Sequence, residues 1–144
     1  MFADLLARLT ASDPAPAPDT DARLALGALL VRLARADGDY SQVERDRIEA
    51  ILMRRYGLPD ASALRADCEQ LEAEAPDTVR FTRAIKDAVA YEDRLAVIES
   101  MWQIVLADGH RDDEENSLMR MTAPMLGVED RDSNLARLRV EAAK

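Results

Sequence analysis

The sequence predicts an all-α protein: a compact bundle of about seven helices containing an internal helix-loop-helix repeat related by an approximate two-fold axis. Three observations predict this class. The composition is dominated by Ala, Leu, Arg, Glu and Asp and has only 5 glycines, which favours helix over strand. Apolar residues recur at helical spacing along most of the chain, without sustained period-two alternation. Finally, one acidic motif and its apolar flank occur twice.

The first 19 residues are expected to stand apart from the domain. Residues 2–9 form a short amphipathic helix candidate. Residues 12–20 alternate proline with small residues, which removes backbone donors and predicts a semi-rigid linker. The helical domain is therefore predicted over residues 20–144, and the sequence leaves open whether the first helix docks onto it.

Seven helices are expected within this domain. Two of them are apolar almost all round and belong in a bundle interior, whereas the others are amphipathic. Gly57 is a candidate C-cap and Pro59 prevents continuation of the second helix. The expected helices span residues 21–36, 41–56, 63–75, 78–90, 94–107, 112–126 and 132–142.

Core positions follow from the same spacing. Cys68 shares a helix face with Leu64 and Leu71 and is expected to be a buried thiol. On the last two helices the residues expected to face inward are Leu118, Met121, Thr122, Met125, Leu135 and Leu138.

The net charge limits the classes of partner that the protein is expected to bind. The chain has 19 basic and 28 acidic residues, a net charge of −9, which disfavours nucleic-acid binding and suits a basic protein partner or divalent cations. A single cysteine cannot form an internal disulfide, and the sequence has no run of about 18 apolar residues. The first ten residues are too short and too charged an apolar stretch to be expected to act as a signal peptide. A soluble cytoplasmic protein without a membrane span is expected.

The repeat consists of an apolar helix, an Ala-Asp-Gly sequence and a following glutamate. Residues 36–38 recur as 107–109 at an offset of 71, and Glu44 recurs as Glu115 at the same offset. The helix after each motif closes on a glycine, in "RRYGL" and "PMLGV", with a one-residue shift. This duplication predicts the approximate two-fold symmetry.

Helix capping explains part of the repeat. Ser41 and Glu44 form an S-x-x-E capping box, and Asp112 with Glu115 forms a D-x-x-E variant. Asp37 and Asp108 are harder to explain, because an acidic residue at a helix C-terminus opposes the helix dipole by about 0.3–1 kcal/mol.

Hard-cation binding is the other interpretation. Carboxylates and loop carbonyls are the ligands that Ca²⁺, Mg²⁺ or Mn²⁺ prefer, and Asp39, Asp112 and Asp113 could add oxygens. The spacing differs from that of an EF-hand, and one histidine with one buried cysteine makes zinc improbable. The residues themselves leave capping and a weak divalent site equally open.

No catalytic machinery is expected. His110 is the only histidine, and no serine or cysteine is placed by sequence to act as its nucleophile. Two functional classes remain: a metal-responsive binding domain, or an acidic protein-interaction scaffold without a metal site. The sequence names neither the protein partner nor the oligomeric state.

A hydrophobic helix ending in Ala-Asp-Gly and followed by a glutamate, twice in a helical chain, resembles the TerB (tellurite resistance) family. A related TerB-like domain occurs in membrane-anchored J-domain co-chaperones. The resemblance covers roughly residues 21–140 and implies a compact helical bundle with a pseudo-two-fold axis. It also implies that the acidic motif residues cluster and bind a divalent metal; here they are Asp37, Glu44, Asp108 and Glu115.

The family further implies a binding or scaffolding role in tellurite resistance and stress responses, without catalysis. The chain departs from the family pattern in its N-terminal helix and proline-rich linker. It also carries His110 where the first copy has Asp39, so the two motifs are not expected to have equal affinity for a metal.

Overall fold

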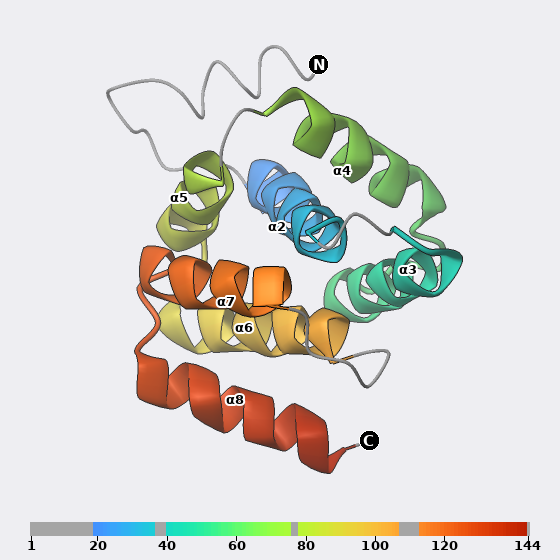
Figure 1. Ribbon diagram of the computed structural model, residues 1–144. Helices are drawn as coiled ribbons and strands as arrows, with labels where there is room; N and C mark the ends of the chain where they lie inside the picture. The colour runs from blue at the N-terminus through green and yellow to red at the C-terminus, as the bar shows by residue number, and fades with distance from the viewer. Residues whose placement is uncertain (1–18, 37–39, 76–77, 107–112, 144) are drawn as a thin grey trace.

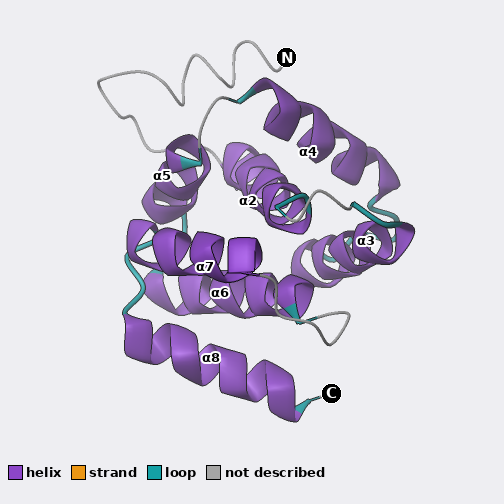
Figure 2. Cartoon of the chain, in the orientation of Figure 1, coloured by secondary structure: helices purple, strands orange, loops and turns teal. Residues whose placement is uncertain are grey.

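The protein is all-α in the computed structural model, which describes residues 19–36, 40–75, 78–106 and 113–143. These residues form seven helices and no strand (Figures 1 and 2). The helices are α2 (Asp19–Ala34), α3 (Gln42–Tyr56), α4 (Ser62–Glu74), α5 (Val79–Ala88), α6 (Tyr91–Val105), α7 (Asp113–Met125) and α8 (Asp130–Ala142). The predicted fold class is confirmed. The amphipathic helix predicted at residues 2–9 lies outside the described ranges.

Helix α2 is the centre of the bundle. It lies among the other helices in Figure 1 and contacts α3, α4, α5, α6 and α7. Every residue from 24 to 34 except Arg32 is buried. The Arg32 side chain extends to the C-terminal end of α4, where its guanidinium donates to the carbonyl oxygens of Glu72 and Ala75 at 3.0 and 2.8 Å. A helix that is apolar almost all round thus occupies the interior, as its sequence predicts.

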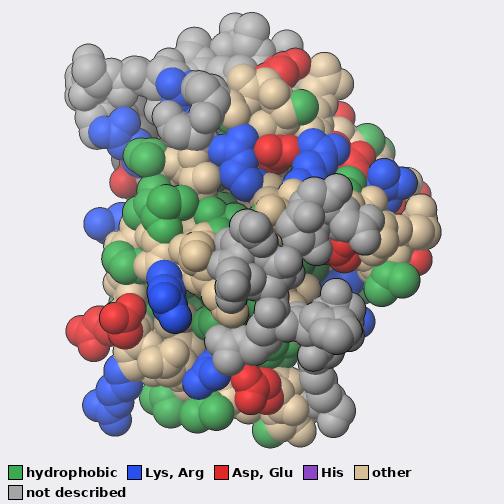
Figure 3. Space-filling model, in the orientation of Figure 1, with side chains coloured by type: hydrophobic (Ala, Val, Ile, Leu, Met, Phe, Trp, Pro, Cys, Tyr) green, Lys and Arg blue, Asp and Glu red, His purple; other side chains and the backbone are tan. Residues whose placement is uncertain are grey.

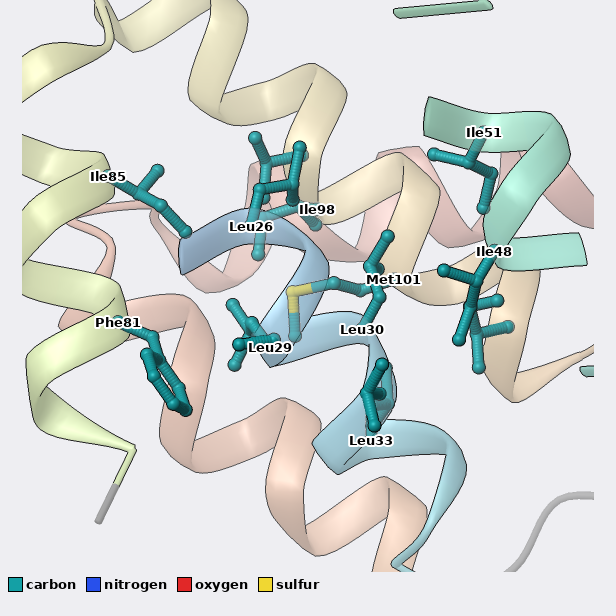
Figure 4. Close-up of a cluster of buried hydrophobic side chains, with 14 of the residues drawn as sticks. Leu26, Leu29, Leu30, Leu33, Ile48, Ile51, Phe81, Ile85, Ile98 and Met101 are labelled. Carbon is teal, nitrogen blue, oxygen red and sulfur yellow. The ribbon is translucent and has the colours of Figure 1, made fainter. Parts of the chain in front are cut away.

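Helix α6 is the second interior helix and packs against both α2 and α8. The core is formed where side chains from α2, α3, α5 and α6 meet, as Figure 4 shows for Leu26, Leu30, Ile48, Phe81 and Ile98. All five are fully or almost fully buried. A core shared by helices far apart in sequence makes α2 to α6 one packed unit.

Glycine ends two of the amphipathic helices. Gly57 and Gly127 have φ of 64° and 73°, a left-handed conformation that glycine adopts without a Cβ penalty. Leu58 N–H donates to the Met53 carbonyl and Val128 N–H to the Ala123 carbonyl, the long-range bond of a Schellman motif. The predicted C-cap glycines are therefore confirmed in both halves of the chain.

Glycine has a different role in the interior of α2. A Cβ placed on Gly27 would lie 2.1 Å from the Cys68 Sγ of α4. The helices approach closely at this point, and Cys68 is fully buried, as its spacing predicts.

The predicted inward face of α8 is wrong. Leu135 and Leu138 are 42% and 51% exposed, and the buried residues are Ser133, Ala136 and Val140. The physical reason is the partner helix: small side chains allow α8 to approach α6, where the Trp102 indole donates to Ser133 Oγ at 3.2 Å. Leucine spacing alone indicated the wrong side of the helix.

The prediction for α7 is wrong at one position. Met121 is 49% exposed, whereas Thr122 is buried, Leu118 packs against the core and Met125 is half-buried. Pro124 lies in the last turn, and the helix ends one residue later.

Two other features stay predictions: the domain boundary at residue 20 and the two-fold relation between the halves. The helix lengths are similar in the two halves, since α2 and α6 span 16 and 15 residues and α3 and α7 span 15 and 13. Within the described ranges, no helix has the length and apolar character needed to cross a membrane.

Candidate functional site

The predicted acidic site falls mostly on segments that the structure does not describe. Asp37, Asp39, Asp108 and Asp112 lie outside the described ranges, as does His110. Asp113 and Glu115 occupy the first turn of α7, where only the backbone is described. Among the predicted ligands, Glu44 is thus the one whose side chain the structure describes.

Glu44 closes the N-terminus of α3. Its Oε1 accepts from Ser41 N–H at 3.2 Å and from Ser41 Oγ at 3.3 Å, and its own N–H donates to Ser41 Oγ at 3.3 Å. The predicted capping box is therefore confirmed. These bonds hold the carboxylate at the end of the first loop, and a carboxylate accepts several bonds, so capping and cation ligation are compatible at one glutamate.

Asp37 and Asp108 lie beyond the ends of α2 and α6. Helix α2 ends at Ala34 and α6 at Val105, so Asp37 and Asp108 each lie three residues past the last helical residue. The dipole effect falls off within the last turn. The expected electrostatic cost at these positions is therefore smaller than the sequence indicated, while the equal spacing in the two copies agrees with the repeat.

Tyr40 anchors the chain directly after the first loop. Its hydroxyl donates to Glu69 of α4, and its ring lies under two guanidinium groups, those of Arg35 and Arg45, at 4.9 and 4.8 Å from the ring centre. Burial and the bond to Glu69 raise the pKa of this phenol well above its ordinary value of 10.0. Sequence reasoning missed this contact, because an aromatic residue in a short acidic loop gives no signal for a partner 29 residues away.

Three glutamates of α3 and α4 form ion pairs with arginines. Glu72 pairs with Arg32 at 3.1 Å and with Arg35 at 2.6 Å. Arg65 bridges Glu49 and Glu69 at 2.9 and 2.7 Å. On the face drawn in Figure 3, acidic side chains lie directly between basic ones. These carboxylates stabilise the contacts of α4 with α2 and α3.

No cluster of three or more possible metal ligands exists among the residues whose side chains are described. The metal ligands predicted from the sequence are Glu44 and residues of the two acidic segments 37–39 and 107–115. The oxygen-only donor set of these segments, apart from His110, fits a hard divalent cation rather than zinc.

A second feature was not predicted from the sequence. A groove of about 530 Å³ lies between α3, α6 and the end of α8, and its lining includes Val43, Arg47, Ile51, Glu99 and Val140. A smaller, more polar cleft of about 360 Å³ lies between α6, α7 and α8 over Trp102. Surface grooves depend on how helices cross, which helical periodicity does not specify.

Residues 23–138 match the family model described as "Tellurite resistance protein TerB". The chain belongs to the TerB family. This match covers most of the 144 residues and confirms the resemblance carried by the two Ala-Asp-Gly motifs. The TerB match ends within α8, so it spans all of the described helices except the first residues of α2 and the end of α8. No curated protein and no solved structure matches the chain.

Proposed function

We propose that this TerB-family domain, a tellurite-resistance-type protein, is a non-catalytic domain that binds a divalent cation. The proposed ligands are Asp37 and Glu44 in the first motif and Asp108 and Glu115 in the second. Asp39, Asp112 and Asp113 would supply further oxygens. Binding is expected to be weak and completed by carbonyls and water, because the named residues supply three carboxylates in the first motif and four in the second, fewer than the six or more ligands that Ca²⁺ prefers when each carboxylate binds through one oxygen.

The distribution of charge carries this proposal. The segments 37–39 and 107–115 contain seven acidic residues and one arginine, a net charge of −6 within a chain of −9. By contrast, Glu72 of α4 is paired with Arg32 and Arg35, and Glu49 and Glu69 are both paired with Arg65. The two repeated segments therefore contribute most of the net negative charge of the chain.

The alternative function is an acidic interaction scaffold without a metal. The same acidic segments would then contact a basic protein partner, and Glu44 would serve only to cap α3. Both functions use the same residues, so the test must measure the effect of added metal on the protein.

Thermal melts of chelated protein with Ca²⁺, Mg²⁺ or Mn²⁺ test the proposal. A ligand that binds only the native state raises stability by about 2.7 kcal/mol at a hundredfold excess over its Kd, which shifts the melting temperature by several degrees. The double variant Asp37→Asn plus Asp108→Asn is expected to lose this shift. Without metal it should be as stable as the wild type, because both positions lie beyond their helices.

The matched control is Asp87→Asn plus Glu74→Gln. It also removes two negative charges near helix C-termini, since both residues are exposed in the last turns of α5 and α4. This control should keep the full metal-induced shift. Wild-type melts that stay the same with all three cations at millimolar concentration would decide against the metal site and in favour of the scaffold.

A further inference from the structure

The outer face of α3 carries a pattern that the core does not explain. Ile48 and Leu52 are buried in the bundle, whereas Val43, Arg47 and Ala50 are exposed. Val43, Arg47, Ala50 and Arg54 follow one another at intervals of four, three and four residues, so they form one stripe along the helix. This stripe is one wall of the groove between α3, α6 and α8.

Part of the groove lining is apolar, and we refer to this part as the floor. It comprises Ile51 of α3, Val140 of α8 and Ala143 just past the end of α8. Val43 at its edge is 61% exposed, the highest value among the large hydrophobic residues whose side chains are described. A groove of about 530 Å³ with this floor is large enough for a few apolar side chains of a docked segment.

The rim of the groove is basic, in contrast to the chain as a whole. Arg47, Arg54 and Arg139 line it, and the adjoining hollow between α3 and α6 adds Arg55. The acidic members of the two linings are Asp46 and Glu99.

Both acidic members already have partners. Asp46 accepts from the neutral Gln42 at 2.8 Å and keeps its negative charge, whereas Glu99 pairs with Arg139 at 3.4 Å. Arg54 donates to the neutral Gln103 at 3.1 Å, and Arg47 has no ion pair within the described part of the chain. Four arginines against two carboxylates thus leave a net charge of +2 at the rim, on a protein whose net charge is −9.

We propose that this groove docks an amphipathic helix of a protein partner whose apolar stripe is flanked by Asp or Glu residues. The apolar floor would take the stripe, and the rim arginines would pair with the flanking carboxylates. A basic partner, which suits the acidic segments, does not suit this groove. The proposal concerns a surface separate from the proposed metal ligands, and it stands or fails independently of them.

The test uses a fluorescent helical peptide of about 15 residues. It has leucines at i, i+4 and i+7 and glutamates on either side of this stripe, and a matched peptide carries lysine in place of every glutamate. Binding of both peptides to the full chain is measured by fluorescence anisotropy, and ¹⁵N NMR locates the contact. The glutamate peptide is expected to bind more tightly, against the direction set by net charge, and to shift the amides of the groove residues in α3 and α8.

Charge reversal supplies the decisive comparison. Arg47→Glu plus Arg54→Glu should weaken binding of the glutamate peptide by about tenfold or more. The control Arg83→Glu plus Arg131→Glu makes the same change in net charge at exposed positions on α5 and α8, away from the groove, and should change affinity by no more than about twofold. Arg47→Glu alone should already weaken binding, and it removes no bond described in the structure.

Several outcomes would overturn the proposal. One is equal weakening by the groove variant and its control, measured on variants with unchanged circular dichroism. Another is contact shifts outside α3, α6 and α8, or no binding at millimolar peptide. A third is displacement of the peptide by anionic lipid vesicles or a single-stranded oligonucleotide at lower concentrations than unlabelled peptide, which would assign the groove to those ligands instead.

Discussion

Replacing Gly27 with alanine tests how tightly α2 and α4 are packed. In an exposed helix interior this change stabilises a protein by about 0.8–1 kcal/mol. Here the new Cβ would lie 2.1 Å from Cys68 Sγ, 3.0 Å from Cys68 Cβ and 3.8 Å from Leu52 Cδ1. Relieving the first contact requires a displacement of more than about 1 Å, because ordinary contacts to carbon start near about 3.5 Å.

Overpacking of this kind costs about 1–3 kcal/mol, so after the gain in helix propensity is subtracted the net effect of Gly27→Ala should be a loss of up to about 2 kcal/mol. Urea unfolding followed by circular dichroism would show it as a lower midpoint at an unchanged slope. Cys68→Ala alone should cost about 1 kcal/mol through a small cavity. In the double variant the new methyl group occupies space left by the sulfur, so the two changes should couple favourably by about 1 kcal/mol or more.

The result that refutes this reasoning is a Gly27→Ala protein more stable than the wild type by the full helix-propensity gain. Strict additivity of the two changes would refute it equally, because it would show that the methyl group added at Gly27 and the Cys68 sulfur do not compete for the same space.

Two further predictions concern helix ends and pH. Gly57→Ala should cost about 1 kcal/mol from its left-handed φ alone, because the new Cβ meets nothing within 4 Å. Gly127→Ala should cost about 1 kcal/mol more than Gly57→Ala in urea unfolding, because its Cβ would lie 2.7 Å from the Arg94 Nη1 that donates to the Leu126 carbonyl. A larger loss of stability in Gly57→Ala than in Gly127→Ala would contradict this reasoning. Burial raises the pKa of Cys68 from 9.0 to about 12, so the stability that comes from keeping the thiol neutral is present below pH 9 and is lost as the pH rises toward 12. The wild type should therefore lose up to about 1.4 kcal/mol per pH unit more than Cys68→Ala over this range, and parallel stability profiles would contradict the assignment.

The elements of the fold were predictable where local chemistry determines them. Ser41, Glu44 and Gly57 specify the ends of α3 through bonds within a few residues, and the structure confirms each. The inward side of α8 was not predictable. Ser133 and Ala136 are buried in place of Leu135 and Leu138, because small side chains allow the helix to approach Trp102. That choice depends on the partner surface, which leucine spacing does not contain.

The candidate sites divide in the same way. The acidic motif was visible because it is repeated in the sequence, and the family match spans both copies. The anchoring of Tyr40 by Glu69 and the arginine rim of the groove were not visible, because they join residues of different helices. Pairwise contacts between distant segments require the crossing geometry of the bundle.

Helix α3 links the two proposed sites and allows a test of their independence. Glu44, a proposed metal ligand, and Val43, at the edge of the groove, are neighbours in its first turn. Arg54, however, lies about 20 Å along the helix from Ser41 at a rise of about 1.5 Å per residue. The Asn substitutions at Asp37 and Asp108 leave the capping box intact, so they should preserve the groove.

These substitutions also remove two negative charges from the protein, so binding of the glutamate peptide should stay within about twofold of wild type or become slightly tighter. The same anisotropy titration measures it. A loss of about tenfold in the Asn double variant would show that the acidic segments themselves form part of the peptide site. The groove would then no longer be a separate surface, even if the charge-reversal variants had behaved as expected.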